Sequence, residues 1–395
     1  MNYFSKTYHK YLNDLIKNLI PANQKGNYIV FKNSFAFTKD IQNEINKTYK
    51  KCKSETRVLV IYFNFFWRPI LDLAEKLNLK ESTSDTEPNW LSQNDINNVF
   101  ELENFEKVKE GKILVFPFQG KLFEIINKLL SLIPIFKELG LITYQIYRPK
   151  IRGDEYSVSI IIPARNESGN IKGVLSKLPK FKKGLEVIFV EGHSKDDTYQ
   201  KIQSEIINNK RKDIKAYIYK QKMVGKNDAV KLGFSKAKNE LFMILDADLT
   251  VNPSELVKFY NAISQNKGEL VIGSRLIYPM EKQAMRLLNY FGNKIFSVIF
   301  SFIIEQKIKD TLCGTKAILK KNYEAIKENQ RYFGNFDPFG DFDLIFGAAK
   351  QNFKIVEIPV RYQERKYGST NIDRFRHGLL LIKMSFIGLQ KLKFR

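Results

Sequence analysis

The stretch Val158–Ile171, which reads VSIIIPARNESGNI, decides the fold, because an unbroken apolar run ends abruptly in a polar segment. Val158–Ile162 predicts a strand that is buried on both faces, and Gly169–Leu178 predicts a helix after it. The same order recurs along the chain, with strands predicted at Glu186–Val190, Leu241–Leu245 and Leu270–Gly273 and helices at Lys226–Ala237 and Ser254–Ser264. This alternation predicts an α/β fold whose mostly parallel sheet is covered on both faces.

Polar motifs follow these strands, at the edge where a parallel sheet binds its ligands. The loop in Ile162–Glu167 can present backbone N–H groups to a nucleotide, although an ordinary loop with a capping side chain explains it equally well. In the second motif, Val190–Thr198, we interpret Glu191 as a ligand contact and Asp196 as a helix cap. His193 is interpreted as incidental rather than catalytic.

The third motif places Asp246 and Asp248 at the exit of the apolar run LFMIL. Paired acids are unfavourable there unless a positive charge neutralises them, and a hard divalent ion that bridges a diphosphate does so. We therefore expect these residues to bind Mg²⁺ or Mn²⁺ rather than to be solvated loop acids. Lys226 opens a predicted helix and can reach a phosphate, although in isolation exposure at a helix end is the simpler interpretation.

Charge and cysteine content narrow the class of protein. Lys and Arg outnumber Asp and Glu by 65 to 42, which favours anionic partners. No nucleic-acid-binding motif accompanies the basic residues. We therefore expect the anionic partners to be nucleotide diphosphates and lipid headgroups rather than nucleic acid. Cys52 and Cys313 are too far apart in sequence to suggest a disulfide framework or a zinc cluster, which fits a cytoplasmic setting. Met1–Ile20 lacks a signal-peptide core, and Ile295–Ile304 is shorter than the roughly 20 apolar residues of a membrane span.

The ordered set of motifs resembles the family-2 glycosyltransferases with the GT-A fold, from about Ser157 to His377. The segments that carry the resemblance are VSIIIPARNESGNI, EGHSKDDT, GKNDAVKLGFSKA and LDADLT. IGSRL, DTLCGTKA and EIPVRYQERKYGSTNI are similar to the branch that contains dolichol-phosphate mannose synthase. The resemblance implies an inverting, metal-dependent enzyme that transfers a sugar from a nucleotide-diphosphate donor to a polyprenyl-phosphate-like lipid. A sugar hydroxyl of a surface polysaccharide or glycolipid is the alternative acceptor, and a nucleotidyltransferase or a non-catalytic scaffold is less favoured.

The same resemblance implies roles for individual residues. The nucleotide-binding loop would contain Pro163, Ala164, Arg165 and Glu167, and Glu191 would contact the base or ribose. The metal and diphosphate motif would be Asp246 and Asp248, the phosphate-contacting positions Arg275 and Arg365, and the acidic residue near the reaction centre Asp343. A sugar-hydroxyl acceptor would need a general base, for which Asp341 and Asp343 are the candidates.

Three departures from the family pattern concern ligand contacts. Gly192 replaces the second of two adjacent acids after Glu191, which leaves the identity of the base open. Thr250 stands where some relatives have Gln as a further metal ligand, so the ion would bind through fewer side chains. Thr370 replaces the Lys that follows Ser369 in the last motif, which removes one expected phosphate contact.

The N-terminal part is expected to be a separate unit, so the domains are 1–150, 156–376 and a basic apolar tail, 377–395. Strands are predicted at Arg57–Asn64 and Lys112–Pro117, and helices at Pro69–Leu77 and Asn94–Glu103. Segments of Arg57–Pro149 resemble the C-terminal half of class I S-adenosylmethionine-dependent methyltransferases, whose cofactor site needs a Gly-rich turn. Between Met1 and Glu110 the only glycine is Gly26. We therefore expect a truncated α/β unit with a structural role and no cofactor site.

Two C-terminal segments suggest membrane binding. Within Arg286–Glu305 a polar stripe of Asn289, Asn293, Ser297 and Ser301 recurs every four residues on an otherwise apolar helix. An interfacial helix on a membrane is preferred, and a buried or oligomer-facing helix is the alternative. With the basic segment Gly378–Arg395, this predicts a peripheral protein on the cytoplasmic face of an anionic membrane, active in cell-envelope synthesis. The formation of a homo-oligomer is left open.

Overall fold

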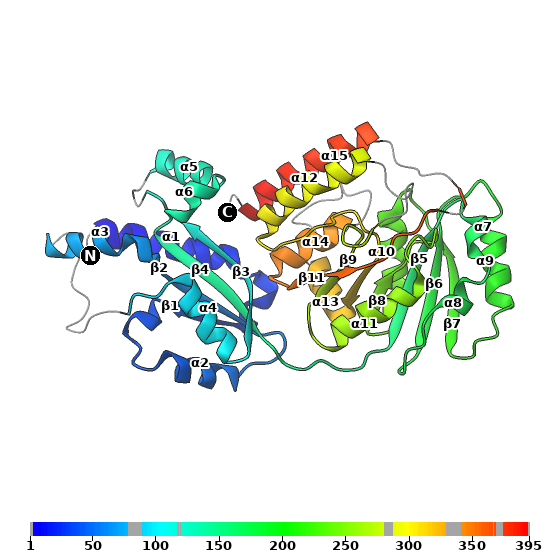
Figure 1. The fold of residues 1–395 in the computed structure, drawn as a ribbon, viewed down its shortest axis with the longest axis horizontal. Helices are drawn as coiled ribbons and strands as arrows, with labels where there is room; N and C mark the ends of the chain where they lie inside the picture. Colours follow the sequence, from blue (N-terminus) through cyan, green and yellow to red (C-terminus); the bar gives the residue numbers. More distant parts are fainter. Residues whose placement is uncertain are drawn as a thin grey trace. The chain divides into compact units, whose positions relative to one another are not determined.

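The computed structural model describes residues 3–77, 89–116, 118, 120–279, 287–328, 341–365, 367–368 and 374–393. The chain divides into two compact units, Met1–Ile151 and Arg152–Lys393, which Figure 1 traces from blue to red. Lys366 and residues 369–371 of the last sequence motif lie outside the described residues, as does Arg286.

The second unit is built on a seven-stranded sheet with the strand order β11-β9-β10-β8-β5-β6-β7. Its strands are β5 (Val158–Ala164), β6 (Leu185–Glu191), β7 (Ile214–Lys220), β8 (Leu241–Ile244), β9 (Leu270–Ser274), β10 (Lys316–Leu319) and β11 (Ile355–Pro359). β10 runs antiparallel to its neighbours β8 and β9, whereas the other paired strands are parallel. The predicted α/β fold with a mostly parallel sheet is confirmed.

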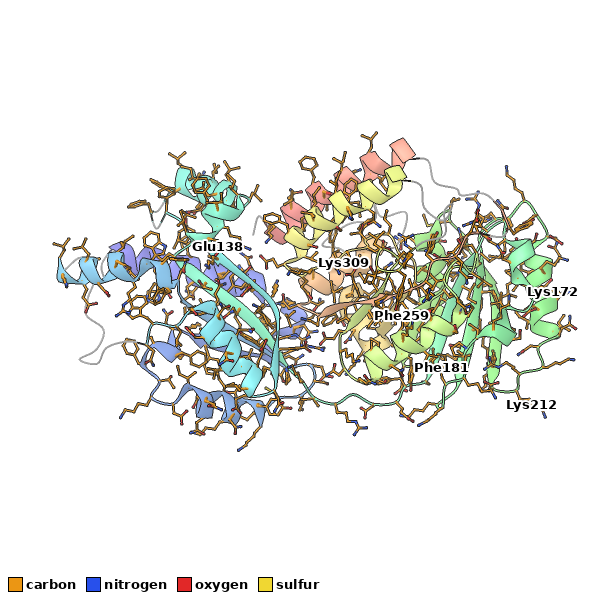
Figure 2. The ribbon with its side chains drawn as sticks, viewed as in Figure 1. Glu138, Lys172, Phe181, Lys212, Phe259 and Lys309 are labelled. Carbon is orange, nitrogen blue, oxygen red and sulfur yellow. The ribbon has the colours of Figure 1, made fainter. Side chains whose placement is uncertain are left out.

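Both faces of this sheet are covered by helices. Alternate residues of β5 point to opposite sides, since Ile161 joins one apolar cluster and Ile160 and Ile162 join the other. The cluster of Ile161 contains residues of α10 (Lys226–Lys236), α12 (Leu287–Ile304), α13 (Lys320–Glu328), α14 (Asp341–Lys350) and α15 (Arg374–Gly388). The opposite cluster contains residues of α7 (Ser168–Ile171), α8 (Val174–Lys177), α9 (Thr198–Ile207) and α11 (Leu256–Ser264). Phe259 of α11, labelled in Figure 2, is fully buried in this second cluster.

Two predicted helices of this unit differ in detail from the observed ones. The helix predicted at Gly169–Leu178 is split into α7 and α8, because Gly173 has a left-handed backbone with φ of 77° that ends the first helical turn. The helix predicted at Ser254–Ser264 begins as the 3₁₀ turn Pro253–Glu255 before α11. Each predicted strand of the unit is present.

The first unit is a four-stranded sheet with the order β1-β2-β4-β3. Its strands are β1 (Tyr28–Lys32), β2 (Arg57–Phe63), β3 (Phe105–Ile113) and β4 (Ile142–Pro149), and its helices are α1 (Tyr3–Leu19), α2 (Ile41–Tyr49), α3 (Arg68–Lys76), α4 (Gln93–Leu102), α5 (Lys121–Leu130) and α6 (Pro134–Glu138). β1 pairs with β2 in parallel, and β4 is antiparallel to both β2 and β3. The strand predicted at Lys112–Pro117 is wrong, because the strand ends at Ile113 and Leu114 turns the chain with φ of 66°.

We predict that Phe300→Ala destabilises the second unit, because Phe300 of α12 is fully buried against the rings of Phe342 and Phe346 of α14. The cavity should lower the free energy of unfolding by about 3–5 kcal/mol, measured from urea midpoints. The control Val298→Ala alters a side chain of the same helix that is 70% exposed. Its cost should stay within about 0.5 kcal/mol. Equal costs for the two variants would contradict the assignment of α12 to the core.

Candidate active site

The carboxyl ends of β5, β6 and β8 lie side by side, and each is followed by a residue with a left-handed backbone. These residues are Asn166, His193 and Leu249, with φ of 56°, 58° and 50°. Leu has no side-chain hydrogen bond to stabilise this conformation, so Leu249 is the most strained of the three. Strained residues gather at functional sites, and ligands bind at this edge of a parallel sheet.

Asp248 is held by contacts to both of its carboxylate oxygens. Its Oδ1 accepts hydrogen bonds from the backbone N–H and the hydroxyl of Thr250, at 3.1 and 2.9 Å. Its Oδ2 accepts from a guanidinium nitrogen of Arg365 at 2.6 Å. The other terminal nitrogen of Arg365 donates to Glu167 Oε1 at 2.9 Å. One arginine therefore joins the acids that follow β5 and β8, and three predicted site residues lie together.

The segment after β11 brings Arg365 to these acids. Val360 N donates to the Ser274 carbonyl at 3.0 Å, which places the chain beside the end of β9. Tyr362 then pairs with Val251, and Gln363 N donates to the Thr250 carbonyl at 2.9 Å. Backbone pairing with the loop after β8 thus places the arginine next to Asp248.

Within this group the pKa values of Arg365 and Glu167 are shifted, with different causes. Burial of Arg365 opposes its charge, but Asp248 and Glu167 outweigh burial and raise the arginine pKa. For Glu167, burial raises the pKa, and the charge of Asp248 adds to this, while Asn170 and Arg365 act in the opposite direction. The pKa of Glu167 therefore lies above its ordinary value, with burial as the main cause.

Asp246 forms a second ion pair, with Lys226 Nζ at 2.5 Å from its Oδ1. Lys226 is the first residue of α10, and Gly225 before it has φ of 109°, a conformation that suits glycine. Burial raises the pKa of Asp246, but the charges of Lys226, Lys316 and Arg275 outweigh it, so the pKa lies below its ordinary value. The Asp246 side chain keeps 35% of its surface exposed. It is thus an ionised carboxylate that solvent still reaches.

Asp343, in the first turn of α14, contacts α10. Its Oδ2 lies 3.0 Å from Lys231 Nζ and accepts a hydrogen bond from Asn227 at 3.3 Å. Because Asn227 follows Lys226 directly, α10 connects Asp343 to the ion pair of Asp246. The side chain of Asp341, the other candidate base, lies outside the described residues.

Arg275 forms a buried ion pair with Asp310, a residue for which the sequence predicts no role. Its backbone N–H and side chain donate three hydrogen bonds to Asp310, at 3.0, 2.7 and 2.8 Å. Asp310 is 1% exposed, and Asn293 donates to it at 2.8 Å. Burial opposes the charge of Asp310, but Arg275 outweighs it and lowers the pKa to about 2. Asp310 opens the DTLCGTKA motif, so the quoted motif was the signal for this buried pair. A phosphate contact by Arg275 stays a prediction.

Hydrogen bonds connect the loop after β5 to the loop after β6. Glu191 is buried and its Oε1 accepts from Ser194 N at 2.6 Å. Ser194 Oγ accepts from Asn166 N at 3.0 Å, and Asn166 Oδ1 accepts from Lys195 N at 2.8 Å. Pro163 and Ala164 end β5, and Arg165 after them is exposed. Asp196 accepts from the N–H of Thr198 at 3.1 Å, but the N-cap residue of α9 is Asp197, so Asp196 lies one residue before the capping position.

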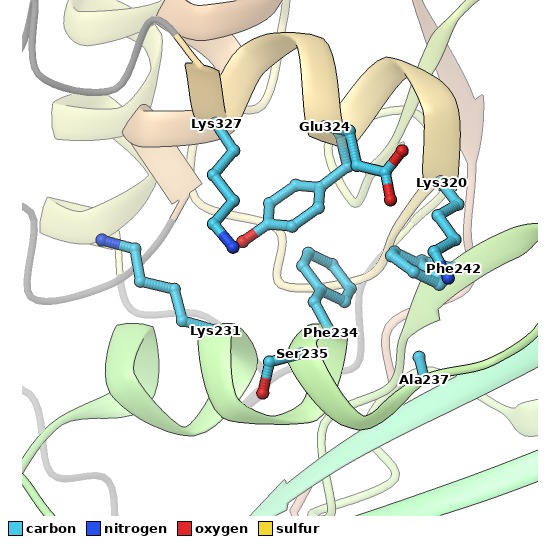
Figure 3. A pocket seen from close by; sticks show the side chains of 9 residues that line it. Lys231, Phe234, Ser235, Ala237, Phe242, Lys320, Glu324 and Lys327 are labelled. Atoms are coloured by element: carbon cyan, nitrogen blue, oxygen red, sulfur yellow. The ribbon is translucent and has the colours of Figure 1, made fainter.

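A separate pocket of about 350 Å³ lies between α10 and α13 (Figure 3). It is lined by Lys231, Phe234, Ser235, Ala237, Phe242, Lys320, Tyr323, Glu324 and Lys327. Phe242 is the second residue of β8, whereas Asp246 and Asp248 follow the other end of that strand. The strand-end carboxylates and this pocket therefore lie at opposite ends of β8.

The carboxylate oxygens of Asp246 and Asp248 suit a hard cation that takes its other ligands from substrate phosphates and water. Within the described ranges, no three side chains of His, Cys, Asp or Glu gather as a metal cluster. Mg²⁺ is typically bound by one or two carboxylates together with substrate phosphates and water. Asp246 and Asp248 fit this pattern.

Comparison with known proteins finds similarity to one family within the second unit. Residues 159–327 match the model of Glycosyl transferase family 2. A dolichol-phosphate mannosyltransferase from Pyrococcus furiosus is 29% identical over 242 residues, which cover 57% of this chain and 64% of that protein. A dolichyl-phosphate β-glucosyltransferase from Saccharomyces cerevisiae is 27% identical, over 59% of this chain and 76% of the relative. The chain thus spans less than two thirds of the Pyrococcus protein.

Among solved structures, the chain is similar to glucosyl-3-phosphoglycerate synthase from Mycobacterium tuberculosis, crystallised with Mn²⁺, uridine diphosphate and glucosyl-3-phosphoglycerate. The identity is 14%, the TM-score is 0.41, and the match covers 60% of this chain and 80% of the other.

We predict that Gly314→Ala disturbs the site and leaves the fold intact. A Cβ at this position would collide with the Asp246 carboxylate and the Lys226 ammonium, which are flexible side-chain ends that can move aside. Affinity for a nucleoside diphosphate with Mg²⁺, measured by calorimetry, should fall about tenfold. In the control Gly292→Ala, the added Cβ meets no atom within 4 Å. Wild-type affinity in the Gly314 variant would show that the packing of Gly314 against Asp246 and Lys226 does not affect ligand binding.

We predict that Asp310→Asn destabilises the second unit, because Arg275 would remain as an uncompensated buried charge. The cost should be about 3–5 kcal/mol near neutral pH. Since the pKa of Asp310 is lowered in the folded protein, its contribution is present above about pH 4 and is lost as the pH falls towards about 2. Urea midpoints measured across this range should converge for wild type and variant at the acid end. The control Asp213→Asn changes a carboxylate that is 41% exposed, and a cost as large in this control would refute the claim.

Proposed function

We propose that this chain, whose second unit carries a glycosyltransferase family 2 domain, transfers a sugar from a nucleotide diphosphate to a polyprenyl-phosphate-like lipid. The observation that carries the proposal is the group of Glu167, Asp248 and Arg365 at the carboxyl edge of the sheet. The relatives named as dolichol-phosphate sugar transferases support the lipid phosphate as acceptor.

Breaking the bond between sugar and diphosphate leaves negative charge on the diphosphate. Asp246 and Asp248 would hold a divalent ion, whose charge would stabilise this leaving group. In the structure Lys226 and Arg365 neutralise the same two carboxylates. With the ion bound, these basic side chains would donate charge-assisted hydrogen bonds to the diphosphate. The same residues thus balance charge before and after the donor binds.

The acceptor phosphate explains why no free general base is required. A lipid phosphate is already ionised near neutral pH, so it can attack the anomeric carbon directly. Attack from the side opposite the diphosphate inverts the configuration at that carbon. Asp343 already accepts from Lys231 and Asn227, which suits a residue that positions α10. For a sugar-hydroxyl acceptor, Asp343 would have to release these contacts and take the proton.

Membrane binding by α12 and α15 belongs to the same proposal. The two helices pack side by side (Figure 1). Two residues of the polar stripe of α12, Asn293 and Ser297, are buried, and Asn293 donates a hydrogen bond to Asp310. Exposed apolar side chains of the pair are Ile295, Val298, Leu379, Ile382 and Phe386, with Lys294 and Lys383 also exposed. Within the described ranges, no helix is long and apolar enough to cross a membrane. This outward apolar face supports peripheral binding, which we place on the cytoplasmic side.

For the first unit we propose a structural role without cofactor binding. Its four strands form a mixed sheet in which only β4 runs antiparallel to the others. Such mixed sheets are common among α/β folds. The family match lies wholly within the second unit. A methyltransferase-like ancestry of the first unit is part of this proposal.

We predict that Asp248→Asn abolishes most transfer and preserves the fold. The amide keeps the shape of the side chain but removes the charge that Arg365 and the metal require. Turnover of nucleotide sugar should fall about 10²–10³-fold. The control Asp197→Asn alters an exposed acid 3.6 Å from Lys201 and should keep wild-type turnover. Near-normal turnover in the Asp248 variant, or full activity of wild type in excess chelator, would refute the metal role.

We predict that Val298→Gln with Phe386→Gln weakens binding to anionic vesicles, because both side chains are exposed on the α12–α15 face. Deleting Gly378–Arg395 would be a poorer test, since Leu381, Met384 and Leu392 are buried in the core. Co-sedimentation should fall by about tenfold, and high salt should lower it further through screening. The control Ile207→Gln replaces an apolar residue of α9 that is 81% exposed. Unchanged sedimentation of the double variant would exclude this face.

A further inference from the structure

The first unit carries a second outward apolar surface, which the proposed function does not use. On α5 and α6 it consists of Leu122, Ile125, Leu129, Ile135 and Phe136, which are between 41% and 77% exposed. Phe66 adjoins this group, because the Lys112 ammonium lies 5.5 Å from its ring centre and 2.5 Å from Glu138 of α6. We call these six apolar residues the α5–α6 face; Figure 2 labels Glu138 at this part of the first unit.

In α5 a polar side chain is buried while three apolar side chains are exposed. Asn127 points inward, accepting from Phe116 N and donating to the Phe116 carbonyl, both at 2.9 Å. Leu122, Ile125 and Leu129 follow a helical spacing and point outward. Water normally meets the polar side of a helix, and a contiguous apolar patch of this kind marks an interaction site.

The charges around the α5–α6 face indicate the kind of partner. The two acids of α5 and α6 are neutralised by lysines from other elements, since Glu124 pairs with Lys10 at 2.9 Å and Glu138 with Lys112 at 2.5 Å. Lys121, Lys128 and Lys137 add positive charge on the same two helices. A second copy of the chain would bring a face of the same charge, which repels. An anionic bilayer offers the opposite charge together with an apolar interior.

We propose that the α5–α6 face docks on an anionic lipid bilayer, with its apolar side chains at the boundary between headgroups and acyl chains. The lysines of α5 and α6 extend their ammonium groups to lipid phosphates while their methylene chains lie along the apolar surface. The first unit therefore has its own membrane contact. This inference rests on residues of Met1–Ile151 alone and does not require the proposed transfer reaction.

The test uses the full chain carrying Val298→Gln and Phe386→Gln, so that the remaining vesicle binding reports the first unit. Binding is measured by co-sedimentation with vesicles of phosphatidylcholine, alone or mixed with phosphatidylglycerol. In this background, Leu122→Gln, Ile125→Gln and Leu129→Gln together should lower binding to mixed vesicles about tenfold or more. The matched control is Leu102→Gln, which alters an exposed leucine of α4. Thermal melting checks that the variants fold.

Three outcomes would overturn the proposal. The first is binding by the triple variant equal to that of the Leu102 control. The second is an absence of binding in the background protein, since the first unit would then have no membrane contact of its own. The third is a shift from dimer to monomer in sedimentation velocity of the triple variant without lipid, because a second copy would then be the occupant. Selective loss of binding to the mixed vesicles, with the protein monomeric throughout, supports it.

Discussion

The ion pairs of Arg365 with Glu167 and Asp248 are the interaction on which the site depends. These acids follow different strands, and without a shared cation their charges would repel at the same edge of the sheet. Removing one partner of such a partly buried group leaves the others uncompensated, which is costly. The pair of Lys226 and Asp246 repeats the arrangement from α10. These cations therefore hold the carboxylates in place, and in the proposed reaction the same cations would contact the diphosphate.

Much of this arrangement follows from local sequence. The apolar runs at β5, β6 and β8 specify buried parallel strands, and the acids that follow them must meet at one edge. What local sequence lacks is the identity of distant partners. Arg275 has a basic side chain suited to phosphate, yet its nearest acid is Asp310 across a loop. Asp343 likewise gains Lys231 only when α14 packs beside α10. Both ion pairs form through tertiary packing, and no periodic pattern in the sequence predicts them.

The errors in the fold prediction have equally local causes. An apolar run predicted a strand over Lys112–Pro117, but the left-handed turn at Leu114 ends the strand early. For the helix predicted from Gly169, the sequence pattern does not reveal the break at Gly173, where the backbone is left-handed. For α12, periodicity identified a polar stripe correctly but could not say which side faces the core. In the structure Asn293 points inward to Asp310 on the same helix as the buried Phe300, whereas Ile295 and Val298 are exposed.

The most direct test of the account is to identify both products of one reaction. Purified protein is incubated with a panel of nucleotide sugars, a polyprenyl phosphate and Mg²⁺ or Mn²⁺, and the products are analysed by mass spectrometry and NMR. The account predicts nucleoside diphosphate and glycosyl lipid phosphate in equal amounts, with the anomeric configuration inverted relative to the donor. Release of pyrophosphate, or a glycosyl product with retained configuration, would contradict it.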